Sequence, residues 1–319
     1  MAEGNSPMHV LSVKQFDRAD MKKLFDLADF MEQSQQLDSR MAPLGNRVLL
    51  SLFGAPSTRT RFSFASAMQR LGGQVIFSDN AKEFSSMAKG ADFEDEIIQM
   101  SQYGDVMVIR FDEPDLVERA AAVSDIPVIS GGSGAGEHPT QGFLDLYTIY
   151  KEVGRLDDLV VTFFGDPRHS RTIHSLARLL ILYNAEMRFV SPQNLMMPDD
   201  LRQELTDARI EFSEHSDLLE AIDRTDAFYI TRPQTNLMEP SLAAGVRGAF
   251  VVTGEAIERG GSGMALLHPF PRTEELPKKF DKLPTAAYLR RQVRNGVWTR
   301  MALLCLVKNV KVRELLNRK

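Results

Sequence analysis

The sequence predicts an α/β protein of two doubly wound, parallel-sheet domains, with the active site in the cleft between them. The chain has 319 residues, enough for two domains of roughly 150 residues each. Short apolar runs rich in β-branched residues alternate with helical apolar periodicity, which is the pattern of βα units. Glycines and polar side chains follow several of these runs, as expected where ligands bind at the carboxyl ends of parallel strands.

Apolar runs bounded by turn residues mark the strands, and amphipathic patterns mark the helices. The predicted helices include Asp17–Met31, Phe143–Val153 and Asn295–Val307. The predicted strands are Arg47–Phe53, Gly73–Phe77, Val106–Phe111, Pro127–Ser130, Leu159–Gly165, Met187–Val190, Ala227–Ile230 and Ala249–Val252.

A domain boundary is predicted after the helix Phe143–Val153. Gly154 and a charged turn follow this helix, and a new βαβ series begins at Val160. The last helix is expected to fold back onto the first domain. The first domain is therefore predicted to comprise residues 1–150 plus 290–319, and the second 151–289.

Composition excludes several classes of function. The net charge of −5 provides no positive field for nucleic acid or for an anionic membrane surface. No apolar run approaches the ~20 residues that span a bilayer, and the N-terminal residues lack signal-peptide features, so a cytoplasmic protein is expected. The one cysteine, Cys305, lies in an apolar run, which favours a packing role over a nucleophilic one.

The segment Phe53–Phe64, FGAPSTRTRFSF, follows a predicted strand and opens a predicted helix. A helix N-terminus presents unpaired N–H groups and partial positive charge. Hydroxyl and guanidinium donors are added there by Ser57, Thr58, Arg59 and Thr60. The segment therefore predicts a phosphate cradle, the alternative being an ordinary N-cap with solvated arginines. No P-loop pattern is present, which argues against ATP or GTP hydrolysis.

Polar residues also follow two other predicted strands of the first half. His138, in the segment EHPTQ, could donate to a carbonyl oxygen, and Gln141 could hold an amide or carbamoyl group from the same side. Simple capping of the following helix, with Pro139 in its first turn, is the alternative. Arg110 ends a predicted strand, although a lone arginine there fits a surface position equally well.

The second half repeats the order of strand, turn and helix at Phe164–Ser175, FGDPRHSRTIHS. This segment lacks GxGxxG, so NAD or FAD binding is not predicted. Arg171 lies there, Arg232 follows a strand in TRPQ, and LHPFPR, from Leu267, reads as a rigid loop. Each fits solvated surface when taken alone. Together with Arg110, the two arginines indicate a ligand with more than one anionic group.

The segments STRTR, HPTQ, DPxxxRTxHS, TRPQ and HPFPR, in this order and spacing, resemble the aspartate/ornithine carbamoyltransferase family. The resemblance runs from His9 to about Asn309, and the first two segments are highly specific to the family. It is closest to the aspartate branch. Where the ornithine branch has His-Cys-Leu-Pro, this chain has HPFPR, and the ornithine branch's Ser-Met-Gly loop is not visible.

The resemblance implies a role for each candidate residue. Carbamoyl phosphate would be bound at its phosphate by Ser57, Thr58, Arg59 and Thr60, at its carbonyl oxygen by Thr60, Arg110 and His138, and at its NH2 group by Gln141 and the backbone carbonyl of Leu267. The carboxylates of the amino acid would be bound by Arg171, Arg232 and Gln234, with Lys89 assisting.

The resemblance also implies an assembly. In the family, a serine and a lysine from one chain reach the site of its neighbour, and Ser85 and Lys89 stand at the matching positions. A homotrimer with shared sites is therefore expected, and a regulatory chain is left open. No cofactor is expected. No metal is expected either, because the six histidines show no ligand-like spacing beyond His169 and His174. These two are interpreted as a loop residue and a helix residue.

The activity implied is transfer of the carbamoyl group to the α-amine of L-aspartate, giving N-carbamoyl-L-aspartate and phosphate for pyrimidine biosynthesis. The catalytic residues Arg59, Thr60, Arg110 and His138 would stabilise charge on the carbonyl oxygen and the departing phosphate. The phosphate itself can accept the amine proton, so no protein base is predicted.

Two positions depart from the aspartate branch. That branch has a glutamate two positions before the serine of STRT, where this chain has Ala55, and an arginine partner where this chain has Leu237. Loss of both partners leaves no orphaned charge, which favours a paired change. The acceptor therefore stays open. The alternatives are a carbamoyltransferase acting on another small amino acid in a specialised pathway, and a catalytically silent paralogue that binds carbamoyl phosphate.

Overall fold

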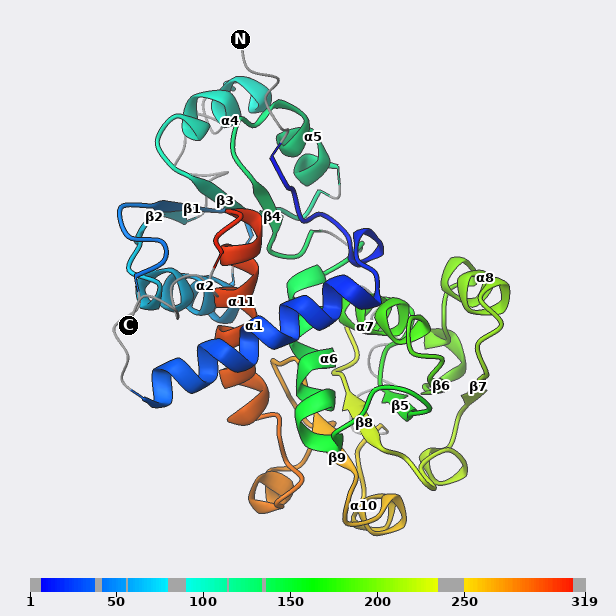
Figure 1. Ribbon diagram of the computed structural model, residues 1–319. Coiled ribbons are helices and arrows are strands. Elements are labelled where there is room, and N and C mark those ends of the chain that lie inside the picture. The colour runs from blue at the N-terminus through cyan, green and yellow to red at the C-terminus, as the bar shows by residue number, and fades with distance from the viewer. Residues whose placement is uncertain are drawn as a thin grey trace. The chain divides into compact units, whose positions relative to one another are not determined.

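The chain divides into two compact units, unit 1 (Met1–Thr140 with Asn295–Lys319) and unit 2 (Gln141–Arg294). The computed structural model describes residues 7–37, 42–55, 57–79, 90–113, 115–133, 136–234 and 250–311 (Figure 1). Both divisions between the units lie inside a helix, α6 (Pro139–Val153) or α11 (Arg291–Val307). The boundaries predicted from the sequence, near residues 150 and 290, therefore stand close to helices that contribute to both units.

Unit 1 contains a parallel sheet with the strand order β2-β1-β3-β4. The strands are β1 (Val48–Phe53), β2 (Gln74–Asp79), β3 (Val106–Arg110) and β4 (Val128–Ser130). All four were predicted, with ends one or two residues away, because each is an apolar run buried inside a parallel sheet. The N-terminal segment joins the sheet through a bridge between Val10 and Ile129.

Helices cover both faces of the unit 1 sheet (Figure 1). On one face lie α4 (Phe93–Ser101) and α5 (Leu116–Val123). Alternate strand residues such as Leu50 and Leu52 join these helices in one apolar cluster. On the other face lie α2 (Thr58–Arg70) and α11. The predicted N-terminal helix is α1 (Arg18–Gln36), which begins after Asp17 in a capping box.

Unit 2 contains a parallel sheet with the strand order β7-β6-β5-β8-β9. The strands are β5 (Val160–Phe164), β6 (Glu186–Val190), β7 (Phe212–His215), β8 (Ala227–Ile230) and β9 (Ala265–Leu267). Periodicity missed β7, a half-buried edge strand of sequence FSEH, and β9, which is only three residues long. The two doubly covered parallel sheets confirm the predicted fold class.

The predicted strand Ala249–Val252 is wrong over its described residues, Phe250 to Val252, which lie outside any strand. Phe250 stacks on Phe164 with ring centroids 4.3 Å apart. Val252 is buried, and its N–H donates to the carbonyl of Glu275 at 2.9 Å. The apolar character of this run therefore serves core packing and not a sheet ladder.

The two faces of the unit 2 sheet carry different cores. Phe164 and Ile230 pack in a cluster that includes residues of α10 (Gly254–Gly260). On the opposite face Phe163 stacks on Phe189 at 5.0 Å and meets the edge of Tyr229 at 5.8 Å. The Tyr229 hydroxyl donates to Asp145 on α6, which places α6 over this face. Two more helices of the unit are α7 (Arg171–Ile181) and α8 (Asp199–Asp207).

Cys305 lies fully buried in α11. Burial raises the pKa of its thiol to about 12, so the thiol stays protonated at neutral pH. This confirms the packing role. Among the residues described, no helix combines the length and apolar character needed to cross a membrane.

Gly165, directly after β5, is expected to tolerate no side chain. Its φ is +127°, and a Cβ there would lie 2.1 Å from the Thr231 carbonyl oxygen. We expect Gly165→Ala to lower the free energy of unfolding by at least about 2 kcal/mol in chemical denaturation. Gly254→Ala is the control, since its Cβ would meet nothing within 4 Å and its position begins α10. Equal denaturation midpoints for the two variants would contradict the prediction.

Candidate active site

Three neighbouring strands of unit 1 end beside the residues predicted to bind a phosphate and a carbonyl group. β1 leads through Gly54 into α2, β3 ends at Arg110, and β4 leads into the loop before His138. Phe53 and Arg110 are register partners, and β3 is in turn paired with β4. Because the sheet is parallel, these carboxyl ends lie on the same side of the sheet, so the fold brings together Thr60 and His138, which are 78 residues apart in sequence.

The first turn of α2 carries the predicted phosphate cradle. Ser57 is the N-cap residue, but its side chain makes no capping hydrogen bond, and Thr58 and Arg59 are exposed. The simple capping alternative is therefore not realised by Ser57. The helix start, with its hydroxyls and the guanidinium, has the chemistry of an anion site.

The structure brings together two of the predicted catalytic residues. Thr60 Oγ1 lies 3.4 Å from His138 Nε2, and both side chains are buried. Gly132, with φ of +98°, makes room for the ring, because a Cβ there would lie 2.8 Å from His138 Cδ2. Arg110 is oriented by donating from Nη1 to the Gly131 carbonyl at 3.2 Å. These three side chains can present donors to one carbonyl oxygen.

A carboxylate fixes the loop that carries His138. Glu137 accepts hydrogen bonds from the Ser12 hydroxyl at 3.0 Å and from the Val13 N–H at 2.8 Å. The 3-10 turn at Val13–Gln15 is thereby attached to the residue preceding His138. This role of Glu137 was not predicted, since its partners lie more than a hundred residues away.

Arg300, on α11, supports the same site from within the core of unit 1. Its side chain is buried and donates to Ser63 Oγ at 3.0 Å and to Thr140 Oγ1 at 3.4 Å. Its guanidinium also lies 5.1 Å from the centre of the Phe64 ring. Arg300 therefore connects α2, which carries the phosphate cradle, to the first residues of α6. Its place in an apolar helix gave no sequence signal of this role.

In unit 2, Asp166 joins the two loops that carry the predicted carboxylate-binding residues. It is fully buried, and it accepts from the His169 N–H at 3.0 Å and from the Gln234 N–H at 2.9 Å. The Gln234 amide also donates to the His169 carbonyl at 2.7 Å. The loop after β5 and the loop after β8 therefore form one hydrogen-bonded unit. Asp166 was not singled out from the sequence.

The two predicted arginines of unit 2 start from neighbouring strands. Arg171 is the first residue of α7, after β5, and Arg232 follows β8, which pairs with β5. Both side chains are partly buried. His174 Nε2 donates to the Pro167 carbonyl at 2.7 Å, and burial lowers the pKa of His174, so this histidine serves as a neutral anchor of the loop. This agrees with its interpretation as a helix residue.

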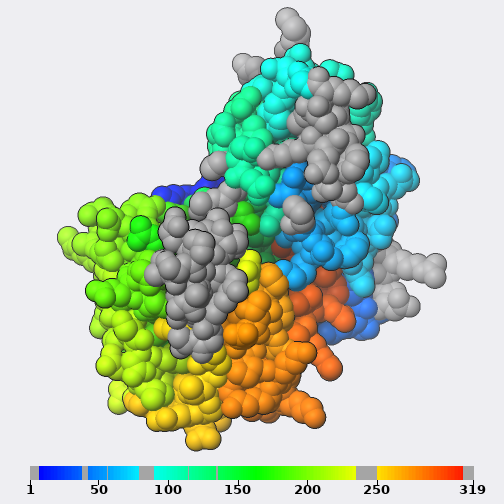
Figure 2. All heavy atoms as spheres, turned by 180° about the vertical axis from the view of Figure 1, so that it is seen from behind, coloured from blue at the N-terminus to red at the C-terminus, as the bar shows by residue number. Residues whose placement is uncertain are grey.

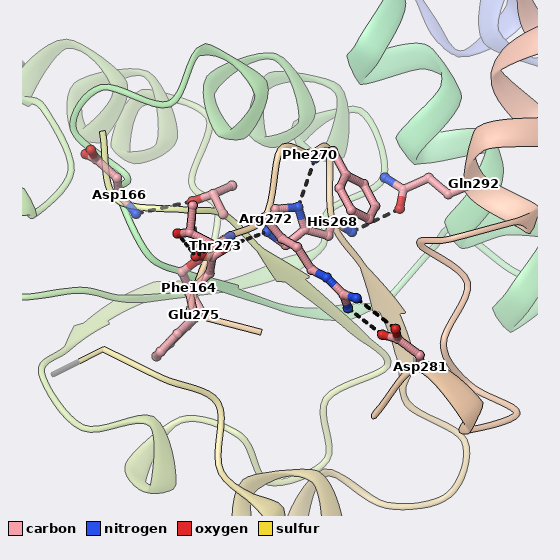
Figure 3. A network of polar contacts seen from close by, with 10 residues as sticks. Phe164, Asp166, His268, Phe270, Arg272, Thr273, Glu275, Asp281 and Gln292 are labelled. Atoms are coloured by element: carbon pink, nitrogen blue, oxygen red, sulfur yellow. Dashed lines mark hydrogen bonds and ion pairs between the residues drawn. The ribbon is translucent and has the colours of Figure 1, made fainter. Parts of the chain in front are cut away.

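The LHPFPR loop is held from both sides (Figure 3). His268 Nδ1 accepts from the Phe270 N–H at 2.8 Å, so Nε2 carries the ring proton and donates to Glu275 at 2.9 Å. The His268 N–H donates to Gln292 Oε1 at 2.9 Å. Arg272 forms a bidentate pair with Asp281, a structural contact that fixes the end of the loop. These contacts thus fix the position of the Leu267 carbonyl, which lies at the end of β9.

Gln141 lies in the first turn of α6. Its Nε2 donates to Asp145 Oδ1, one helical turn later, at 2.9 Å. The other branch of the amide, Oε1, therefore faces away from that carboxylate. An oxygen acceptor in this orientation suits an NH2 donor, which agrees with the role that the resemblance implies.

Several predicted positions lie outside the described residues, namely Ser85, Lys89 and Leu237. Ala55 is described and is buried. Within the described ranges, no group of three or more His, Cys, Asp or Glu side chains is arranged to hold a metal ion.

Comparison with known families agrees with this arrangement. Residues 8–151 match the model of the carbamoyl-P binding domain of aspartate/ornithine carbamoyltransferases, and residues 157–307 match that of the Asp/Orn binding domain. The chain belongs to the aspartate/ornithine carbamoyltransferase family. The resemblance inferred from STRTR and HPTQ is thereby confirmed.

Relatives named for the aspartate branch resemble this carbamoyltransferase over nearly its whole length. The aspartate carbamoyltransferase catalytic subunit of Methanopyrus kandleri is 43% identical over 302 residues, 93% of this chain and 96% of that protein. The chloroplastic aspartate carbamoyltransferase of Arabidopsis thaliana is 42% identical over 301 residues, 93% of this chain and 77% of that protein.

Solved structures give the same result. The catalytic subunit of M. jannaschii aspartate transcarbamoylase is 37% identical with a TM-score of 0.87, covering 94% of this chain and 98% of that one. Aspartate transcarbamoylase from Trypanosoma cruzi, in complex with aspartate and phosphate, is 34% identical with a TM-score of 0.85, covering 94% of each chain. The two-domain fold is therefore that of aspartate transcarbamoylase catalytic chains.

Glu275 is expected to make stability depend on pH. Burial opposes its ionisation, yet hydrogen bonds from His268 and Thr273 hold its pKa at about 2. Because this pKa is depressed, the stabilisation is complete above about pH 4.5 and is lost as the pH falls toward 2. Glu275→Gln should lower the free energy of unfolding at pH 7 by up to about 3 kcal/mol, and by less at pH 3.5.

Urea denaturation at the two pH values measures this difference. Glu274→Gln is the matched control, because Glu274 is the exposed neighbour in the same loop. We expect it to stay within about 0.5 kcal/mol of the unaltered protein at both pH values. A Glu275→Gln effect that is the same at pH 3.5 as at pH 7 would show that the carboxylate is not ionised in the way its contacts require.

Proposed function

We propose that this chain is an aspartate carbamoyltransferase, which transfers the carbamoyl group of carbamoyl phosphate to the α-amine of L-aspartate. The observation that carries the proposal is the convergence of Thr60, Arg110 and His138 beside the phosphate cradle of α2. Family membership supports the same activity. A silent paralogue that binds carbamoyl phosphate would keep the same donors, so turnover is the property that separates the two functions.

The proposed chemistry needs positioning and polarisation but no covalent intermediate with the enzyme. Phosphate is a good leaving group, so the uncharged amine attacks the carbamoyl carbon directly. Donors from Thr60, Arg110 and His138 stabilise negative charge that develops on the carbonyl oxygen. Arg59 and the N-terminus of α2 stabilise the departing phosphate, which takes the amine proton.

Unit 2 supplies the groups proposed for the second substrate. Arg171 and Arg232 follow neighbouring strands, and Gln234 is tied to the same loops through Asp166. Two cationic groups suit an amino acid with two carboxylates. The T. cruzi structure, whose described ligands are aspartate and phosphate, supports L-aspartate over other small amino acids. The product, N-carbamoyl-L-aspartate, would then serve pyrimidine biosynthesis.

Replacing His138 should lower the catalytic rate while the protein still folds. We expect His138→Ala to lower kcat about 10²- to 10³-fold, as loss of one donor to a developing oxyanion typically does. The assay is phosphate release from carbamoyl phosphate with a panel of amino acids, with the product mass recorded.

His215→Ala is the control for that assay, because His215 lies on the edge strand β7 and contacts Ser213. It should keep the unaltered rate. If the unaltered protein turns over only with another amine, the aspartate assignment is wrong. If it turns over with none while it binds carbamoyl phosphate, the silent-paralogue alternative is favoured.

We also propose that the chain forms a homotrimer with shared sites. Supporting this, three large apolar side chains on α2 and the edge strand β2 are more than half exposed, Phe62, Ile76 and Phe77. The Arg61 guanidinium lies within 6 Å of both aromatic rings, at 5.4 Å and 5.8 Å. Figure 2 shows atoms of this part of the chain, in light blue, at the surface. An exposed apolar edge strand is a common protein contact surface.

Ser85 and Lys89, the residues expected to reach a neighbouring chain, come after β2 in the sequence. Phe77→Asp should therefore convert the trimer to single chains in sedimentation velocity and abolish turnover as well. Tyr103→Asp, at an exposed aromatic outside this cluster, should change neither property. A fully active single chain would contradict site sharing.

A further inference from the structure

One buried carboxylate connects the two groups that are assigned to the carbamoyl NH2. Asp145 is fully buried on α6. Its Oδ1 accepts from Gln141 Nε2 at 2.9 Å and from Gln292 Nε2 at 2.6 Å. Its Oδ2 accepts from the Tyr229 hydroxyl at 2.6 Å. Both oxygens are thus engaged, and the two glutamine amides meet at the same atom.

The second amide branch of Gln292 fixes the peptide that carries the other acceptor. Gln292 Oε1 accepts the N–H of His268 at 2.9 Å. In a planar trans peptide the C=O points opposite to the N–H, so this bond also sets the direction of the Leu267 carbonyl. Figure 3 shows the Gln292 side chain reaching from α11 toward His268.

The orientation of each amide follows from its partners. A carboxylate only accepts, so the NH2 branches of Gln141 and Gln292 must face Asp145, and the N–H of His268 requires the oxygen branch of Gln292. Burial raises the pKa of Tyr229 well above its ordinary value, and Asp145 acts in the same direction, so the phenol stays a donor. An ion pair between Arg291 and Glu152 holds the start of α11 against α6.

We propose that Gln292 and Asp145 are positioning residues that hold Gln141 Oε1 and the Leu267 carbonyl in register as paired acceptors for the carbamoyl NH2. This inference rests on the proposed function. Its consequence is specificity. An acceptor pair that is fixed in advance favours NH2 over a methyl group of the same size, because a methyl group leaves both acceptors without a donor.

The test compares two hydrolysis-resistant ligands that differ only in that group, phosphonoacetamide and 2-oxopropylphosphonate. Calorimetry measures the dissociation constant of each. The unaltered protein should prefer the amide. Gln292→Met keeps the side-chain length but removes both hydrogen bonds, and we expect it to lower that preference about tenfold by weakening amide binding alone. The methyl ketone should bind within twofold of its original affinity.

Tyr229→Phe is the matched control. It removes a buried hydrogen bond to the same carboxylate without touching either acceptor, so the preference should persist even if the melting temperature falls. Should Gln292→Met fail to fold, Gln292→Asn serves the same comparison, since the shorter amide cannot reach both Asp145 and the His268 N–H.

The outcomes separate the inference from the function on which it rests. If the affinity of the Gln292 variant falls equally for both ligands, the role of Gln292 is only structural and the proposal is overturned. The same holds if the preference is unchanged. If the unaltered protein fails to distinguish the ligands and does not turn over carbamoyl phosphate, the proposed function itself fails.

Discussion

Parallel strand pairing is the constraint on which the rest of this structure depends. In each unit, the carboxyl ends of three adjacent parallel strands lie on the same side of the sheet. These strands are β1, β3 and β4 in unit 1 and β5, β8 and β9 in unit 2. Every described candidate residue except Gln141 follows one of these strands or ends it. Gln141 sits one turn into the helix that begins after the β4 loop. The sheets therefore decide which polar segments become neighbours, whatever their separation in sequence.

Carboxylates that are buried, or partly buried in the case of Glu137, fix the loops that follow these strands. Glu137, Asp145, Asp166 and Glu275 each accept two or more hydrogen bonds, from backbone N–H groups or from neutral side chains. In these contacts uncharged donors satisfy the negative charge. A protein that must bind two anionic substrates can in this way keep negative charge inside its core.

Sequence reasoning succeeded where a signal is local. Apolar runs predicted seven of the nine strands in the described part of the chain, because a strand buried on both faces must be continuously apolar. The STRTR segment was recognised because hydroxyls and an arginine at a helix start suit an anionic ligand such as phosphate. It failed for β7, where polar residues alternate at an edge, and for the run at Phe250, where stacking on Phe164 explains the apolar residues.

The positioning network gave no local signal beyond the contact of Asp145 with Gln141, since Tyr229 and Gln292 lie 84 and 147 residues away from Asp145. An aspartate inside a helix and a glutamine at the start of another look like surface positions until the fold brings them together. The roles of Gln141 and Leu267 came from family resemblance. The physical reason why they could act together, a shared carboxylate, needed the structure.

The residues proposed to bind the phosphate and the carbonyl oxygen lie in unit 1, whereas those proposed for the carbamoyl NH2 and for the amino acid lie in unit 2. In unit 1 the α2 start, Arg110 and His138 present donors, which suit a phosphate and a carbonyl oxygen. Unit 2 carries the residues proposed to bind the amino acid, and Asp166 fixes two of its loops. Ala55, which is buried in unit 1, stands where the aspartate branch has a glutamate, so this chain lacks that charge near the phosphate cradle. The Asp166 contacts of unit 2 do not involve this position. We therefore expect the choice of the amine acceptor in this chain to depend first on Arg171, Arg232 and Gln234.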